Sequence, residues 1–214
     1  MESKIFSFTA HTMNIAITGS IGAGKSTVAA ILAALLPARR IDVDQINRRL
    51  METGAAGWRQ LRQIFPDHFF AENGELRRAE LRQAVFFDEE RRRQLEGVLH
   101  PLIAAELWRE MAAGEDFCLI EIPLLFESGW QRRFDAVVTV YIPEAAGIER
   151  VIARDQVSAA QVAKILAAQL PAAEKAARAD WVIDNRGDIS SSFIQSSWLC
   201  EQLRRKARQV KKMR

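Results

Sequence analysis

The feature that most constrains the fold is a glycine-rich segment, GSIGAGKST, at residues 19–27. It matches the pattern G-x-x-x-x-G-K-[ST], in which backbone amides and a lysine surround the phosphates of a nucleotide. The residues before it, 13–18, have the composition of a short strand. The residues after it carry apolar side chains at the spacing of one helix face, at Val28, Ile31, Leu32 and Leu35. A strand, a glycine loop and an amphipathic helix in this order predict a nucleotide-binding α/β protein.

Each part of the loop has a predicted task. Its glycines allow the backbone to curl, so that several N–H groups point into one concavity around the β-phosphate. Lys25 would reach the β- and γ-phosphates, and the hydroxyl of Ser26 would bind Mg²⁺. The predicted ATP-binding residues here are Gly22, Ala23, Gly24, Lys25, Ser26 and Thr27. The motif indicates a bound nucleoside triphosphate but does not say what happens to it.

The rest of the chain alternates strand-like runs with helical patterns. Four further strands are expected at residues 41–44, 117–122, 136–142 and 181–183. Strands separated by helices favour a three-layer α/β fold with a five-stranded parallel sheet. Within the helical stretches, Asp88 is a candidate cap, and Pro101 suits the first position of the next helix. Ser158 and Gln161 form a capping-box pattern, and a last helix should fill most of residues 189–212.

This pattern predicts a nucleotide-binding core that two other segments interrupt. The core would comprise residues 13–50, 116–143 and 178–214, the last part ending in a basic helix. Residues 51–115 and residues 144–177 would form the two interrupting segments, and the first of them is helical throughout. Residues 1–12 read as an N-terminal extension, which leaves open whether translation starts at Met1 or Met13.

Composition excludes several other classes of protein. No run of about 18 apolar residues is present, so a spanning helix and a membrane partner are not expected. The N-terminus lacks a secretory signal, and Cys118 and Cys200 read as buried thiols in a reducing cytoplasm. The net charge of +3 comes from residues 201–214, which hold seven basic residues and one acidic residue. Such a tail does not indicate a specific nucleic-acid partner. We expect a monomer, with a homo-oligomer as the alternative.

Asp44 is the candidate general base. It is placed at the end of the second predicted strand, and loops that follow parallel strands leave from the ligand-binding edge of the sheet. A carboxylate there can accept the proton of an acceptor hydroxyl. The alternative is a helix N-cap, with a helix from Gln45 onward, and the two roles are compatible. Asp42, two residues earlier, is expected to be structural.

Six motifs in chain order resemble the dephospho-CoA kinase family: G-S-I-G-A-G-K-S-T-V-A, I-D-V-D, L-R-R-A-E-L-R, H-P-L-I, I-P-L-L-F-E and A-D-W-V-I-D-N-R-G. The resemblance covers about residues 13–187. It implies a P-loop kinase that uses ATP, dephospho-CoA and Mg²⁺, in which residues 51–115 bind the phosphoryl acceptor and residues 144–177 form a lid. The implied reaction transfers the γ-phosphoryl group to the 3′-hydroxyl of the ribose of dephospho-CoA, which is the last step of coenzyme A synthesis.

The resemblance also implies roles for individual residues. The implied catalytic residues are Asp44, Lys25, Arg150 and Arg154, the two arginines belonging to the lid. The implied substrate-binding residues are Arg78, His100, Leu124 and Glu127. Asn185 would lie near the adenine. Two positions depart from the family pattern: Glu121 replaces a shorter aspartate that could assist Mg²⁺, and Gly147 replaces a lid glutamine.

Some alternatives remain at this stage. Arg154 could pair with the adjacent Asp155, His100 could simply begin a helix, and Glu127 could be a plain surface carboxylate. A kinase of nucleosides or nucleotides is the nearest alternative function. A GTPase switch is disfavoured because the guanine motif N-K-x-D is absent. A motor-type ATPase usually needs a longer chain and an arginine from a second subunit.

Overall fold

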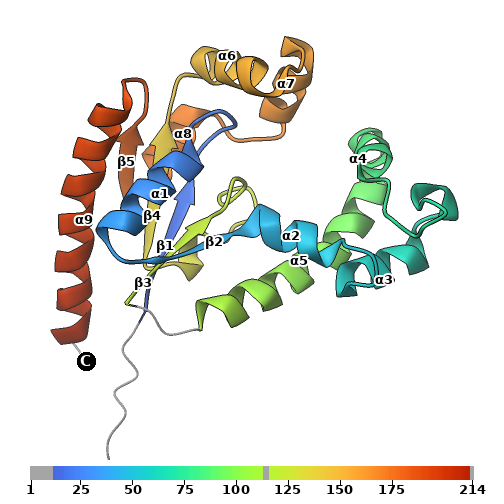
Figure 1. The fold of residues 1–214 in the computed structure, drawn as a ribbon, viewed down its shortest axis with the longest axis horizontal. Coiled ribbons are helices and arrows are strands. Elements are labelled where there is room, and N and C mark those ends of the chain that lie inside the picture. The colour runs from blue at the N-terminus through green and yellow to red at the C-terminus, as the bar shows by residue number, and fades with distance from the viewer. Residues whose placement is uncertain (1–11, 113–115, 213–214) are drawn as a thin grey trace, which may run out of the picture. The chain divides into compact units, whose positions relative to one another are not determined.

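The computed structural model describes residues 12–112 and 116–212 (Figure 1). The chain forms two compact units, one comprising Met1–Ile41 with Ala113–Arg214 and the other Asp42–Ala112. The expected N-terminal extension therefore lies, apart from Thr12, outside the described residues. Among the described helices, none combines the length and apolar character required to cross a membrane.

The first unit is built on a sheet in the order β2-β3-β1-β4-β5. The strands are β1 (Met13–Thr18), β2 (Arg39–Asp42), β3 (Phe117–Glu121), β4 (Ala136–Tyr141) and β5 (Trp181–Asp184). β1 runs parallel to both β3 and β4, and β4 runs parallel to β5. The three central strands are almost entirely buried because their apolar runs are covered on both faces. The parallel α/β sheet expected from the sequence is confirmed.

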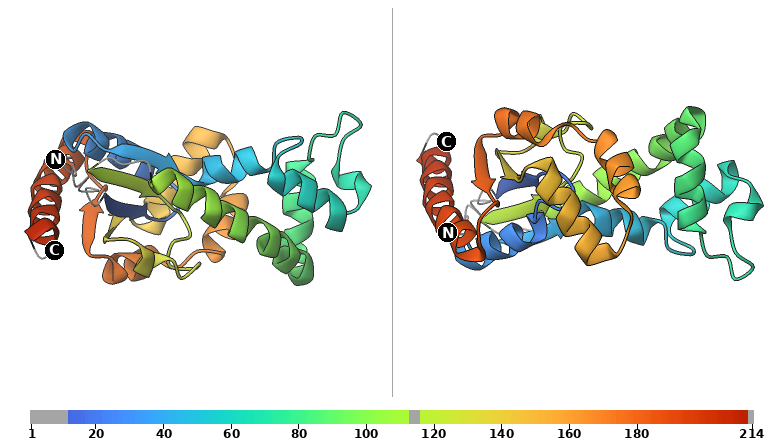
Figure 2. Two further views of the ribbon diagram at one scale, coloured as in Figure 1. Left: turned by 90° about the horizontal axis from the view of Figure 1, so that it is seen from below. Right: turned by 90° about the horizontal axis from the view of Figure 1, so that it is seen from above.

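Helices cover both faces of this sheet. The helices of this unit are α1 (Lys25–Leu35), α6 (Glu144–Asp155), α7 (Ala159–Ala167), α8 (Ala172–Arg178) and α9 (Ile189–Lys212), with a short 3-10 turn at Gln131–Arg133. Of these helices, α1, α8 and α9 contact the strands. Figure 2 shows α1 and α9 side by side, with the strands between α1 and α8. The core between α1, α9 and the sheet includes the fully buried side chains of Ile17, Leu32, Val138, Leu199 and Leu203.

Two sequence predictions about helix ends and thiols in this region are confirmed. Ser158 and Gln161 form the expected capping box at the start of α7. Cys118 and Cys200 are buried thiols, and desolvation raises the pKa of the Cys200 thiol to about 11. A thiol with such a pKa is protonated at neutral pH and is therefore poorly reactive.

The second unit is a small helical body organised around one long helix. Its elements are α2 (Val43–Leu50), α3 (Ala56–Ile64), a 3-10 turn at Asp67–Phe69, α4 (Arg78–Phe87) and α5 (Glu89–Met111). α5 packs against α2, α3 and α4, and the expected cap at its start is confirmed because Asp88 accepts a hydrogen bond from the Arg91 amide.

The prediction that Pro101 begins a helix is wrong, because Pro101 lies inside α5. Proline lacks the N–H that would bond to the carbonyl four residues earlier, so it normally marks a helix start or a break. Here Leu99, Ile103 and Leu107 repeat every fourth residue and are at most 7% exposed. Burial of this stripe against the other helices of the unit outweighs the lost hydrogen bond.

The expected strand at residues 41–44 is also wrong in its boundaries. β2 ends at Asp42, and Asp44 lies in the first turn of α2. The Oδ1 atom of Asp42 accepts hydrogen bonds from the amides of Asp44, at 2.8 Å, and Gln45, at 3.3 Å. Asp42 therefore supplies the N-cap that had been considered for Asp44, and its expected structural role is confirmed.

Candidate active site

The glycine loop between β1 and α1 has the backbone conformation that phosphate binding requires. Gly19, Gly22 and Gly24 have positive φ angles of 149°, 76° and 85°. Gly24 is the N-cap of α1 and has no side chain with which to occupy the first-turn amides. The positive end of the α1 dipole and these amides together favour an anion at this position.

Lys25 is folded over this loop. Its Nζ atom donates to the carbonyl oxygens of Gly19 and Ser20, at 3.0 Å each. These bonds hold the ammonium group beside the curled backbone rather than out in solvent. Ser26, the next residue, is exposed in the first turn of α1. The structure thus brings together the lysine and the hydroxyl that the sequence assigned to the phosphates and the metal.

The loop also packs closely against α6. A Cβ atom at Gly22 would lie 2.4 Å from the carbonyl oxygen of Gly147, and one at Gly147 would lie 3.0 Å from the carbonyl oxygen of Ile21. Glycine at 147 therefore has a packing reason: a glutamine there would press on the loop.

We predict that Gly22→Ala lowers nucleotide affinity by roughly tenfold or more, because a left-handed alanine alone costs about 1–2 kcal/mol. The contact with the Gly147 backbone adds to this cost. The matched control is Gly129→Ala, since Gly129 also has a positive φ but no neighbouring atom within 4 Å. Calorimetric titration with Mg·ADP checks the prediction. Equal affinities in the two variants would contradict it.

Asn185, which follows β5, braces the same loop. Its Nδ2 atom donates to the carbonyl oxygen of Ala23 at 2.7 Å, and its Oδ1 atom accepts from the Ser192 hydroxyl at 2.6 Å. Arg150 donates to the Asn185 carbonyl oxygen at 2.9 Å. The structure therefore brings Asn185, Arg150 and the loop together, with Asn185 linking the loop to α9.

Arg154, the second of the two predicted arginines on α6, has a different partner. Arg154 forms two hydrogen bonds with the carboxylate of Asp155, at 2.7 and 2.8 Å. Hydrogen bonding to this carboxylate raises the pKa of Arg154 above its usual value, and the same bonds lower the pKa of Asp155. The Arg154 side chain is 68% exposed, and exposed pairs of this kind are weak. The guanidinium can therefore exchange this partner for another anion.

Within the second unit, Asp44 and Arg78 line one groove of about 310 Å³. Its other polar lining residues are Asn47, Arg48 and Arg82, and its floor includes Leu99. Arg78 also donates to the carbonyl oxygen of Arg48 at 2.9 Å, which ties α4 to the last turn of α2. A groove with three arginines suits an anionic ligand.

His100, the residue after Leu99, is exposed on α5, whereas Leu99 faces the groove. Sequence analysis missed Arg48 and Arg82, although Arg82 belongs to the same L-R-R-A-E-L-R motif and lies one helical turn from Arg78.

The loop after β3 contains the remaining predicted substrate residues. Leu124 is 44% exposed, whereas the carboxylate of Glu127 accepts a hydrogen bond from the Leu170 amide and forms an ion pair with Lys175. Glu121, at the end of β3, is buried and pairs with Arg40 at 2.7 Å. Lys175 is a residue that sequence analysis missed.

No cluster of three His, Cys, Asp or Glu side chains able to hold a metal ion occurs in residues 12–112 and 116–212. Mg²⁺ does not need such a cluster. It dehydrates reluctantly and is usually held by one or two protein oxygens together with substrate phosphates. The exposed hydroxyl of Ser26 is the protein oxygen that suits this mode of binding.

The parallel sheet, the glycine loop and Lys25 define a P-loop NTPase fold. In agreement, shikimate kinase from Acinetobacter baumannii shares the fold, with a TM-score of 0.50 at 19% identity over 91% of this chain and 92% of that one. The family model for dephospho-CoA kinase matches residues 13–191. The chain belongs to the dephospho-CoA kinase family.

Individual relatives agree with this assignment. The dephospho-CoA kinases of Desulfotalea psychrophila and Methylococcus capsulatus are 38% and 39% identical, covering 86% and 82% of this chain and 94% and 89% of theirs. A crystal structure of a Thermus thermophilus protein has a TM-score of 0.77 at 34% identity over 89% of this chain and 98% of its own. Dephospho-CoA kinase from Campylobacter jejuni has a TM-score of 0.64 at 26% identity over 89% and 96%.

Proposed function

We propose that this protein transfers the γ-phosphoryl group of ATP to the 3′-hydroxyl of the ribose of dephospho-CoA, giving coenzyme A and ADP. The observation that carries the proposal is the glycine loop with Lys25 folded over it, in a chain of this family. Phosphoryl transfer of this kind needs little covalent chemistry from the protein, so its residues act by positioning and by stabilising charge.

The ATP site consists of the loop and the first turn of α1. The backbone amides of this segment bind the β-phosphate, and Lys25 exchanges the carbonyl oxygens of Gly19 and Ser20 for β- and γ-phosphate oxygens. Ser26 would hold Mg²⁺. When bound, the ion neutralises charge that develops on the phosphate oxygens. Arg150 and Arg154 stabilise the transferring phosphoryl group, Arg154 after it releases Asp155.

The acceptor site is the groove of the second unit. Dephospho-CoA carries a pyrophosphate, and the planar guanidinium of Arg78 suits bidentate bonds to its oxygens. Asp44 orients the ribose hydroxyl and accepts its proton. This role is compatible with the position of Asp44 in the first turn of α2, since its side chain is not needed as the cap.

A comparison of acceptors tests the proposal. With ATP and Mg²⁺, kcat/KM for dephospho-CoA should exceed that for AMP or adenosine by about 100-fold or more, because a site built for the pyrophosphate leaves its arginines unpaired with smaller acceptors. ADP release measures the rate, and phosphorus NMR of the product locates the new phosphate. A preference for AMP would indicate a nucleotide kinase, and rapid ATP hydrolysis without acceptor would indicate an ATPase.

A further inference from the structure

Lys175, on α8, is the most deeply buried charged residue among those described, with a side chain that is 0% exposed. Its Nζ atom donates to the carbonyl oxygen of Pro123 at 2.7 Å and forms an ion pair with Glu127 at 2.9 Å. Burial of an ammonium group is costly unless its donors are satisfied. The reason for burying Lys175 should therefore lie in the contacts that its two partners, Pro123 and Glu127, make.

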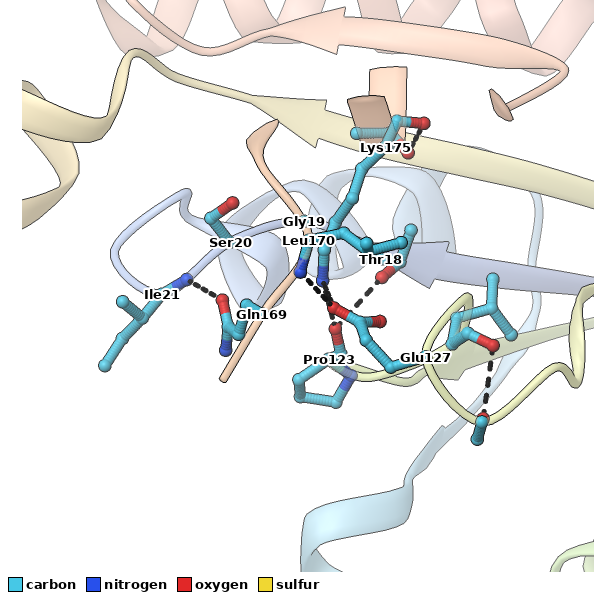
Figure 3. A network of polar contacts seen from close by, with 12 residues as sticks. Thr18, Gly19, Ser20, Ile21, Pro123, Glu127, Gln169, Leu170 and Lys175 are labelled. Carbon is cyan, nitrogen blue, oxygen red and sulfur yellow. Dashed lines mark hydrogen bonds and ion pairs between the residues drawn. The ribbon is translucent and has the colours of Figure 1, made fainter. Parts of the chain in front are cut away.

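The first partner of Lys175, Pro123, also contacts the residue just before the phosphate-binding loop. The carbonyl oxygen of Pro123 also accepts a hydrogen bond from the Thr18 hydroxyl, at 3.3 Å. Thr18 is the last residue of β1 and directly precedes Gly19. One carbonyl oxygen therefore receives hydrogen bonds from Lys175 and from the residue at which the loop begins (Figure 3).

The second partner of Lys175, Glu127, contacts the segment that touches the tip of the same loop. The carboxylate of Glu127 accepts a hydrogen bond from the Leu170 amide at 2.8 Å, in the connection between α7 and α8. The neighbouring Gln169 accepts a hydrogen bond from the Ile21 amide through its side-chain oxygen, at 3.1 Å. Figure 3 shows this contact beside the Lys175–Glu127 pair. Glu127 thus anchors the lid segment that contacts the tip of the loop.

We propose that Lys175 and Glu127 are positioning residues that hold the phosphate-binding loop in its nucleotide-binding shape by joining the start of the loop to α8 and the tip of the loop to the α7–α8 connection. This inference rests on the proposed function, since the loop is taken to seat ATP. Lys175 has no exposed surface and so acts through Thr18, Pro123 and Gln169 rather than on a phosphate. Glu127 acts through Lys175 and Leu170, in place of a contact with the acceptor.

The test compares Lys175→Met, Glu127→Gln and the double variant. Lys175→Met keeps the length of the side chain and removes its charge, whereas Glu127→Gln keeps an oxygen for the Leu170 amide. The matched control is Glu174→Gln, one residue away on α8, which removes a surface ion pair with Arg178. Each variant is titrated with Mg·ADP and assayed with ATP and dephospho-CoA, at a temperature well below its melting temperature.

We expect Lys175→Met to raise the Kd for Mg·ADP and the KM for ATP by about tenfold, because the Glu127 carboxylate, whose side chain is already 18% exposed, loses its partner, turns toward solvent and releases the loop. The KM for dephospho-CoA should change by less than about twofold, since the acceptor groove lies in the other unit. The double variant should be impaired less than the product of the two single effects, because no buried charge is left unpaired. Glu174→Gln should behave as the native protein.

Three results would overturn the proposal. A lower melting temperature with unchanged Kd for Mg·ADP would show that the pair only stabilises the fold. A rise confined to the KM for dephospho-CoA in Glu127→Gln would show that Glu127 contacts the acceptor. Independent effects in the double variant would show that the two residues do not act together.

If Lys175→Met fails to fold, Glu127→Gln decides the question. The Mg·ADP titration does not depend on the acceptor. It therefore still measures the effect of each variant on nucleotide binding if dephospho-CoA proves not to be the substrate.

Discussion

Asp44→Asn is expected to lower kcat for phosphoryl transfer by about 10²–10⁴, because general-base assistance contributes on this order and an amide cannot accept the proton. The affinity for Mg·ADP should remain within about twofold of the native value, because the substitution preserves the shape of the side chain and leaves the glycine loop intact. Steady-state kinetics with dephospho-CoA and calorimetric titration with Mg·ADP measure the two quantities.

Asp42→Asn is the matched control for this loss of charge. Asp42 caps α2 through its Oδ1 atom, and asparagine is an equally good N-cap. The control should therefore retain both the helix and the activity. Native turnover in Asp44→Asn would remove Asp44 from the mechanism, and equal losses in both variants would point to a general effect of charge or of α2.

Lys25→Ala is expected to weaken both nucleotide binding and turnover. Removal of one preorganised group that stabilises developing charge typically lowers kcat by about 10²–10³. The affinity for Mg·ATP should fall as well, since the ammonium group contacts the phosphates in the ground state. The measurements are the Kd for Mg·ADP and the kcat for dephospho-CoA phosphorylation.

Two further variants sharpen the result for Lys25. Lys25→Arg keeps the positive charge but replaces a compact ammonium with a wider planar group, so it should restore binding only in part. Arg205→Ala removes an exposed positive charge from α9 and should leave both quantities unchanged. An active Lys25→Ala protein would contradict the assignment of residues 19–27 as the ATP site.

Local patterns allowed much of the fold to be predicted. The apolar runs of the central strands, the capping box at Ser158 and the cap at Asp88 all depend on residues close together in sequence. The prediction for residues 41–44 failed because the local pattern there fits two structures. The prediction for Pro101 failed because burial of the apolar residues of α5 outweighs the effect of the proline. Alternating residues suit a strand end as well as a capped helix start, and a proline is tolerated inside α5 because that helix buries a long apolar stripe.

Part of the candidate site could be predicted from the sequence, and part of it could not. Residues 19–27 carry their own chemistry, so Lys25 and Ser26 follow from the motif alone. The groove residues Arg48 and Arg82 were missed, because one arginine among many carries no signal until the helices bring several together. The contact of Gly147 with the loop was likewise invisible, since it joins two segments that are far apart in sequence.

The sequence by itself determined the glycine loop, the alternation of strands and helices in the core, and the family, because these are encoded in short stretches of adjacent residues. Only the tertiary structure decided what Lys175 does. A lysine on a helix is normally exposed, and its burial against Pro123 and Glu127 depends on two segments, α8 and the loop after β3, that meet only in the folded chain. The physical reason is that the cost of burying a charge depends on the partners that surround it, and these partners are set by packing rather than by neighbours along the chain.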